Sequence, residues 1–93
     1  MMKKEAIHVY YSGTVQGVGF RFTVERIGRQ MGLTGWIKNL PDSRVEAFCE
    51  GNKKDLNLFL EKVRLSMSGY ISNETVNWIE ASGEFDSFEI SFF

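Results

Sequence analysis

The sequence predicts an α+β fold, in which one antiparallel β-sheet carries two helices on one face in the order β-α-β-β-α-β, plus a short C-terminal strand. Segments of alternating apolar and polar residues are interrupted by two segments with apolar residues at helical spacing. Glycine or proline stands near most of the boundaries between these segments. With 93 residues, 43% of them hydrophobic, the chain has the length and the apolar content of a single domain.

The first half of the pattern is a strand, a loop and a helix. Residues 6–12 alternate between apolar and polar side chains, which predicts a strand with one buried face. A glycine-rich loop follows over residues 13–19. Apolar residues then recur every three or four positions from Phe20 to Met31, which predicts an amphipathic helix, and Gly32 is a natural stop for it.

A β-hairpin is expected next. Residues 33–39 and 44–50 both read as strands, and the second alternates regularly. The short segment between them contains Pro41, the only proline of the chain, followed by Asp42. Proline and aspartate favour tight turns, so the two strands are predicted to pair with each other.

The second helix and the last two strands complete the order. Asn52 is a suitable N-cap, and apolar residues at helical spacing over residues 56–63 predict the helix. We expect a loop over residues 66–74, a strand over 75–81 and, after a turn, a last strand over 88–92. This order is that of the split βαβ, ferredoxin-like sandwich, with both helices on one face of the sheet.

Composition excludes several classes of function. The net charge of -1 gives no electrostatic reason to expect nucleic acid or an anionic membrane as a partner. Cys49 is the only cysteine, so no intramolecular disulfide can form, and there is no Cys/His cluster typical of a zinc site. No signal-peptide core and no run of about 20 apolar residues is present. We expect a cytoplasmic protein without a structural zinc site.

The stretch TVQGVGFRF, residues 14–22, raises the question of function. Glycines lie directly before a helix, and Arg21 stands in its first turn. The first N–H groups of a helix lack internal acceptors, and loop N–H groups can form a concave anion nest, so such a junction can bind phosphate. The GxGxxG and P-loop spacings are both absent. On physics alone, a plain tight turn with an exposed arginine is an equally good interpretation.

Motifs over most of the chain resemble the acylphosphatase family. The segment GTVQGVGFR (residues 13–21) is similar to the family signature, and GLTGWIKNL (residues 32–40) is similar to its second motif. The segments RVEAFCEG (44–51) and FEI (88–90) also match family landmarks. The resemblance implies hydrolysis of acyl phosphates, the mixed anhydrides of carboxylic and phosphoric acid, to a carboxylate and inorganic phosphate.

The resemblance also implies a role for each site residue. Arg21 matches the arginine that binds the phosphoryl group, and Asn39 matches the asparagine that orients the attacking water. The implied backbone cradle consists of Gln16, Gly17, Val18, Gly19 and Phe20. No metal or organic cofactor is implied. A carboxylate leaves readily, so positioning and charge stabilisation carry most of the catalysis. The small-molecule substrate needs no macromolecular partner, and we expect a monomer.

Three departures from the family pattern bear on affinity and specificity. Thr14 stands where the family usually has Arg or Lys, which removes a positive charge near the cradle. Ser43 stands where glycine is frequent, so the hairpin turn can differ. The segment 66–74 lacks the Gly-Pro pattern of many members, which leaves the preference for the acyl half open.

Rival functions stay open at this stage. The same cradle would serve a non-catalytic phosphate-binding or regulatory module, although Asn39 argues for an oriented water. RNA-binding RRM domains share the element order, but residues 44–51 lack their aromatic RNP1 pattern and carry Glu46 and Glu50. The related first domain of hydrogenase-maturation carbamoyltransferases is a further alternative. His8 and Cys49 are expected to be structural.

Overall fold

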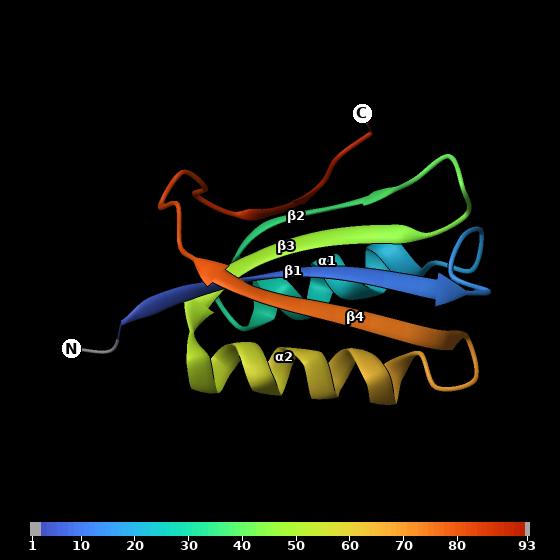
Figure 1. The fold of residues 1–93 in the computed structure, drawn as a ribbon, viewed down its shortest axis with the longest axis horizontal. Helices are drawn as coiled ribbons and strands as arrows, with labels where there is room; N and C mark the ends of the chain where they lie inside the picture. Colours follow the sequence, from blue (N-terminus) through green and yellow to red (C-terminus); the bar gives the residue numbers. More distant parts are fainter. Residues whose placement is uncertain (1–2, 93) are drawn as a thin grey trace.

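The computed structural model describes residues 3–92 and shows one five-stranded sheet with both helices on the same face (Figure 1). The strand order across the sheet is β4-β1-β3-β2-β5. The predicted ferredoxin-like α+β fold is therefore confirmed. The elements are β1 (Lys4–Gly13), α1 (Phe20–Gln30), β2 (Thr34–Asn39), β3 (Val45–Asn52), α2 (Lys53–Ser66), β4 (Ile71–Glu80) and β5 (Phe88–Ile90).

The direction of β5 differs from the prediction of a wholly antiparallel sheet. The four longer strands pair antiparallel, but β5 pairs parallel with β2, with Gly35 opposite Phe88 and Ile37 opposite Ile90. The chain leaves β4 at one edge of the sheet and crosses to the opposite edge, where β5 runs in the direction of β2. Glu50 supports this crossing, because its buried carboxylate accepts hydrogen bonds from the backbone N–H groups of Ser82 and Gly83.

The start of β4 also differs from the prediction. The strand begins at Ile71, so the predicted loop 66–74 is shorter and its second half pairs with β1. Ser72, Asn73 and Glu74 have weak strand propensity and show no alternation, which is why their sequence reads as a loop. Pairing with the buried strand β1 decides their conformation instead.

The core lies between the helices and the covered face of the sheet. Ile7, Val9 and Tyr11 of β1 point into it, as the alternation predicted. Cys49 is also fully buried, and this burial raises the pKa of its thiol. The predicted cap of α2 is confirmed, because Asn52 Oδ1 accepts a hydrogen bond of 2.8 Å from the Asp55 N–H.

Two chain segments that matter for function meet at one end of this sandwich. The loop that leads from β1 into α1 and the hairpin that joins β2 to β3 lie at the same end of the sheet (Figure 1). The sequence motifs are thus neighbours in space although about 20 residues separate them. Within residues 3–92, neither helix is long and apolar enough to cross a membrane.

Candidate active site

The loop before α1 is exposed at Gly17, Val18 and Gly19. Gly17 and Gly19 have φ angles of 77° and 76°, the left-handed region that glycine adopts without strain. Val18 between them has no positive φ, and this alternation of sign is the geometry of an anion-binding nest. Gly19 is the N-cap of α1, where no side chain caps the helix and no acidic residue lies in the first turn. The positive end of the helix dipole is therefore open to an anion.

Both ends of this loop are anchored. The side chain of Phe20 is buried, and its ring meets that of Tyr11 edge-on with 5.1 Å between centroids. At the other end the Thr14 N–H donates to the Tyr70 carbonyl at 2.9 Å. Thr14 thus contributes to the loop through its backbone. The cradle is held in place by the core on one side and by the segment before β4 on the other.

Arg21 is half-buried at the first turn of α1. Its guanidinium carbon lies 5.3 Å from the centroid of the Phe92 ring, in cation–π contact. Among residues 3–92 no carboxylate lies within ion-pairing distance of it. Its charge is therefore not neutralised by a described neighbour, and its five donors suit a phosphate.

Asn39 is the last residue of β2 and pairs with Val45 of β3. Its side-chain oxygen Oδ1 is buried and has no hydrogen-bond partner within the described part of the chain. A buried polar atom without a partner is costly and often marks a site that binds a ligand or a water. The amide of Asn39 has the donors and the acceptor that orienting a water requires.

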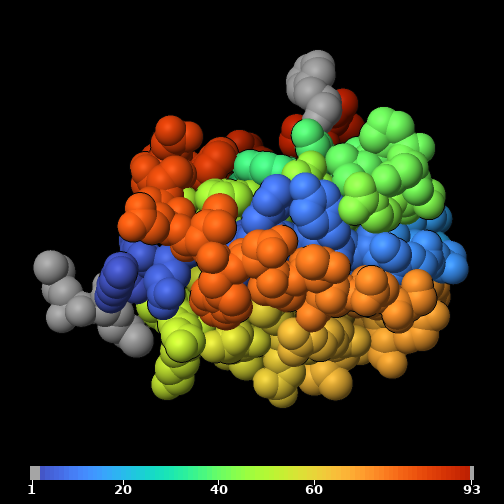
Figure 2. Space-filling model, in the orientation of Figure 1, coloured from blue at the N-terminus to red at the C-terminus, as the bar shows by residue number. Residues whose placement is uncertain are grey.

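The side chain of Gln16 joins the loop to the hairpin that follows Asn39. Its Nε2 donates to the carbonyls of Leu40 and Arg44, both at 2.9 Å. In the surface view the hairpin and the loop lie against each other at one end of the molecule (Figure 2). The sequence analysis assigned Gln16 only a backbone role, so this function was missed. The sequence did contain a signal for these contacts, since Gln16 is a long polar side chain inside a glycine-rich loop.

The cations beside Asn39 are already paired. Lys38 Nζ lies 3.7 Å from Glu46 Oε1, and Arg44 Nε lies 2.8 Å from Asp42 Oδ2. Hydrogen bonds from the Arg44 backbone and side chain lower the pKa of Asp42. On the sheet face that the helices leave open, His8 Nε2 lies 2.6 Å from Glu46 Oε2, away from the loop. These side chains stabilise the surface of the sheet, and among residues 3–92 they leave Arg21 as a cation beside the cradle with no carboxylate paired to it.

A metal ion has no evident place in this arrangement. Residues 3–92 contain no group of three or more His, Cys, Asp or Glu side chains that could hold one. The cradle consists of backbone N–H groups, a guanidinium and an amide, and the N–H and guanidinium donors suit an anion. The chemistry it can perform is the positioning of a phosphoryl group and of a water beside it.

Comparisons with known proteins identify the family of the chain. The model of the acylphosphatase family matches residues 7–90. An acylphosphatase of Anaeromyxobacter dehalogenans is 33% identical over 93 residues, 99% of this chain and 100% of its own length. One of Archaeoglobus fulgidus is 46% identical over 59 residues, 63% of this chain and 66% of its own length, just under two thirds. The crystal structure of acylphosphatase from Bacillus subtilis superimposes with a TM-score of 0.88 at 31% identity, covering 95% of this chain and 99% of that one. The chain therefore belongs to the acylphosphatase family, enzymes that hydrolyse acyl phosphates.

Proposed function

We propose that this chain hydrolyses acyl phosphates by in-line attack of a water oriented by Asn39 on a phosphoryl group held by Arg21 and the backbone N–H groups of residues 16–20. The observation that carries the proposal is the open helix N-terminus at Gly19, joined to an Arg21 side chain that no described carboxylate neutralises. Family membership supports the reaction class.

The reaction needs little acid–base catalysis. The water oxygen forms the new bond to phosphorus, and the bond from phosphorus to the acyl oxygen breaks. The electron pair of that bond leaves with the carboxylate, a weak base that needs no general acid, and the proton of the water passes to the phosphate product or to solvent. As charge redistributes over the phosphoryl oxygens, Arg21 and the N–H groups stabilise it.

Asn39 acts by position in this scheme. An amide does not take up a proton at neutral pH, so Asn39 cannot serve as a base. Its buried Oδ1 accepts from the water, which aligns the water oxygen with phosphorus. Orientation of this kind is worth several orders of magnitude in rate when the geometry is right.

Benzoyl phosphate hydrolysis in the presence of EDTA tests the proposal. We expect the wild type to turn over, Arg21→Ala to lose phosphate affinity as well as rate, and Asn39→Ala to lose about 100-fold or more in kcat while it still binds inorganic phosphate. Arg26→Ala and Asn57→Ala are matched controls, because both residues are exposed helix residues outside the site, and both variants should keep wild-type rates.

Two results would contradict the proposal. A folded wild type that binds inorganic phosphate without turnover would favour the non-catalytic phosphate-binding module instead. Loss of turnover in EDTA with recovery on metal addition would refute the metal-independent reaction.

We also propose that residues 1–93 act as one domain and as a monomer in the cytoplasm, with a small-molecule acyl phosphate as substrate and no nucleic acid or membrane as a partner. One core supports the single domain. A single unfolding transition would support the single domain. A mass of one chain in sedimentation would support the monomer, and a dimer at micromolar concentration would contradict it.

A further inference from the structure

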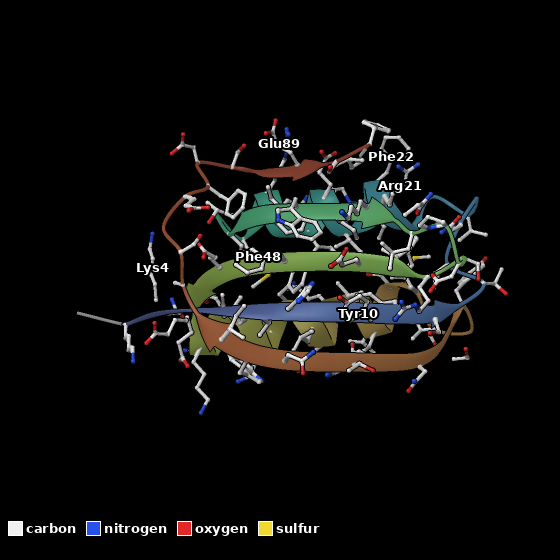
Figure 3. The ribbon with its side chains drawn as sticks, turned by 45° about the horizontal axis from the view of Figure 1, so that its top comes forward. Lys4, Tyr10, Arg21, Phe22, Phe48 and Glu89 are labelled. Carbon is white, nitrogen blue, oxygen red and sulfur yellow. The ribbon has the colours of Figure 1, made fainter. Side chains whose placement is uncertain are left out.

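The chain beyond β5 reaches the phosphate site along the edge of the sheet. The parallel pairing of β5 with β2 continues past its last residue, because the Ser91 N–H donates to the Ile37 carbonyl at 2.8 Å. This bond fixes the segment that carries Phe92. Figure 3 shows Arg21 and Phe22 at the corner of the molecule toward which this segment runs, and Glu89 earlier along the chain on β5. The segment thus borders the proposed catalytic arginine.

Phe92 contacts Arg21 and also lines a groove. Its ring contacts the guanidinium of Arg21, and Phe92 also lines a surface groove along β2 and β5. The ring is 73% exposed, so packing in the core does not explain its position. Because the ring lies against the Arg21 guanidinium, a ligand held at Arg21 would meet it. Phe92 is the residue through which the groove meets the phosphate site.

The groove has the size and the walls of a small-molecule site. Its volume is about 690 Å³, and rings of Trp36 and Phe85 line it together with Phe92. Trp36 is held by stacking on Phe48, with 6.1 Å between centroids and 14° between planes. Trp36 is therefore in place before a ligand arrives, which reduces the entropic cost of binding.

The charge of the groove restricts what can enter. Glu84, Asp86 and Glu89 line it together with one cation, Lys38. Lys38 is paired with Glu46 and Glu89 with Arg29, which leaves the carboxylates of Glu84 and Asp86 in excess. Carboxylates in a partly enclosed groove disfavour a further anionic group. A neutral apolar or ring-bearing group fits both the walls and the charge.

We propose that the acyl half of the substrate lies in this groove against Phe92, so that the enzyme selects acyl phosphates with an apolar or ring-bearing acyl group over small or anionic ones. The inference rests on the proposed function, since it assumes that the phosphoryl half is held at Arg21. Phe92 is then the specificity-determining residue, because it contacts the substrate where the two halves meet.

The ratio of kcat/KM for benzoyl phosphate to that for acetyl phosphate tests this. Phe92→Ala should lower the ratio about fivefold, since an aromatic contact is lost that acetyl phosphate cannot make. Phe92→Tyr keeps the ring and should restore the ratio. Phe22→Ala is the matched control: Phe22 is 63% exposed and adjacent to Arg21 in the chain, but it does not line the groove, so its ratio should stay within about twofold of the wild type.

Each other outcome overturns the inference. An equal loss for both substrates in Phe92→Ala would mean that Phe92 acts only through Arg21. A shift in Phe22→Ala as large as that in Phe92→Ala would place the acyl half outside the groove. Both exposed positions should keep the melting temperature of the wild type, which separates these outcomes from misfolding. A folded wild type that hydrolyses neither substrate would refute the proposed function and this inference with it.

Discussion

Replacing Gln16 by methionine tests how the phosphate loop and Asn39 are held together. Methionine has about the length of glutamine but no donor, so the variant removes both hydrogen bonds of 2.9 Å to the Leu40 and Arg44 carbonyls. Neither carbonyl is left without a partner. Leu40 still accepts from the Ser43 N–H at 3.3 Å, and Arg44 still accepts from the Leu40 N–H at 2.8 Å.

The expected effect on catalysis exceeds the effect on stability. Two neutral hydrogen bonds contribute about 1 kcal/mol each, so the free energy of unfolding should fall by about 1–2 kcal/mol and Tm by on the order of 5–10 °C. The hairpin that follows Asn39 loses its tie to the loop, and a displacement of about 1 Å in an oriented group costs about 100-fold in rate. We expect kcat to fall roughly 10- to 100-fold. Phosphate affinity should stay within about threefold, because Arg21 and the loop N–H groups are untouched.

Benzoyl phosphate kinetics and the inhibition constant of inorganic phosphate give both numbers in one assay. Gln30→Met is the matched control, because Gln30 is exposed at the end of α1 and lies outside the loop. It should leave kcat and Tm unchanged. The reasoning is refuted if Gln16→Met keeps the wild-type kcat. It is equally refuted if phosphate affinity falls as much as kcat, since Gln16 would then serve the cradle itself rather than its tie to Asn39.

Two further predictions concern strain and titration. Ser43 has a φ of 77°, and Ser43→Gly should raise the free energy of unfolding by about 0.5–1 kcal/mol, since relief of left-handed strain exceeds the entropy cost of glycine; a lower Tm would contradict this. Burial and the nearby Glu74 carboxylate raise the pKa of Tyr11, so its contribution to stability is complete below its ordinary pKa of about 10 and is lost as the pH rises above it. The Tyr11 hydroxyl also lacks a described hydrogen-bond partner, so Tyr11→Phe should be neutral or stabilising at pH 7. Above about pH 10 the free energy of unfolding of this variant, measured by denaturant titration, should fall less steeply with pH than that of the wild type. A loss above about 2 kcal/mol at pH 7 would show that the hydroxyl has a partner.

Local patterns predicted most of the fold because local chemistry decides most of it. The strand over residues 6–12, the helix from Phe20 and the cap at Asn52 all follow from periodicity or turn chemistry, and the structure has each of them within a few residues. The direction of β5 and the start of β4 depend on which distant strand each segment meets. No window of the sequence contains that information.

The candidate site divides in the same way. Glycines before a helix and the arginine after them are read directly from residues 17–21. The bonds of Gln16 to the hairpin span 24 and 28 residues, and the contact of Arg21 with Phe92 joins α1 to the segment that follows β5. Contacts of this range come from the topology of the sheet, which brings the ends of β1 and β2 to the same place. Sequence motifs can indicate which residues belong to a site, but they do not show which of these residues contact each other.

The absence of a basic surplus in the composition is compatible with the proposed phosphate site. A net charge of -1 would argue against phosphate as a ligand if side-chain charge did the binding. In the proposed site the donors are backbone N–H groups at Gly17 and Gly19 and the end of a helix dipole, which no count of charged residues registers. Lys38 and Arg44 beside Asn39 are neutralised by carboxylates, so Arg21 supplies the one unneutralised side-chain charge among the described residues of the cradle. Affinity at such a site depends on backbone geometry, which is why the glycines matter more to it than the overall charge.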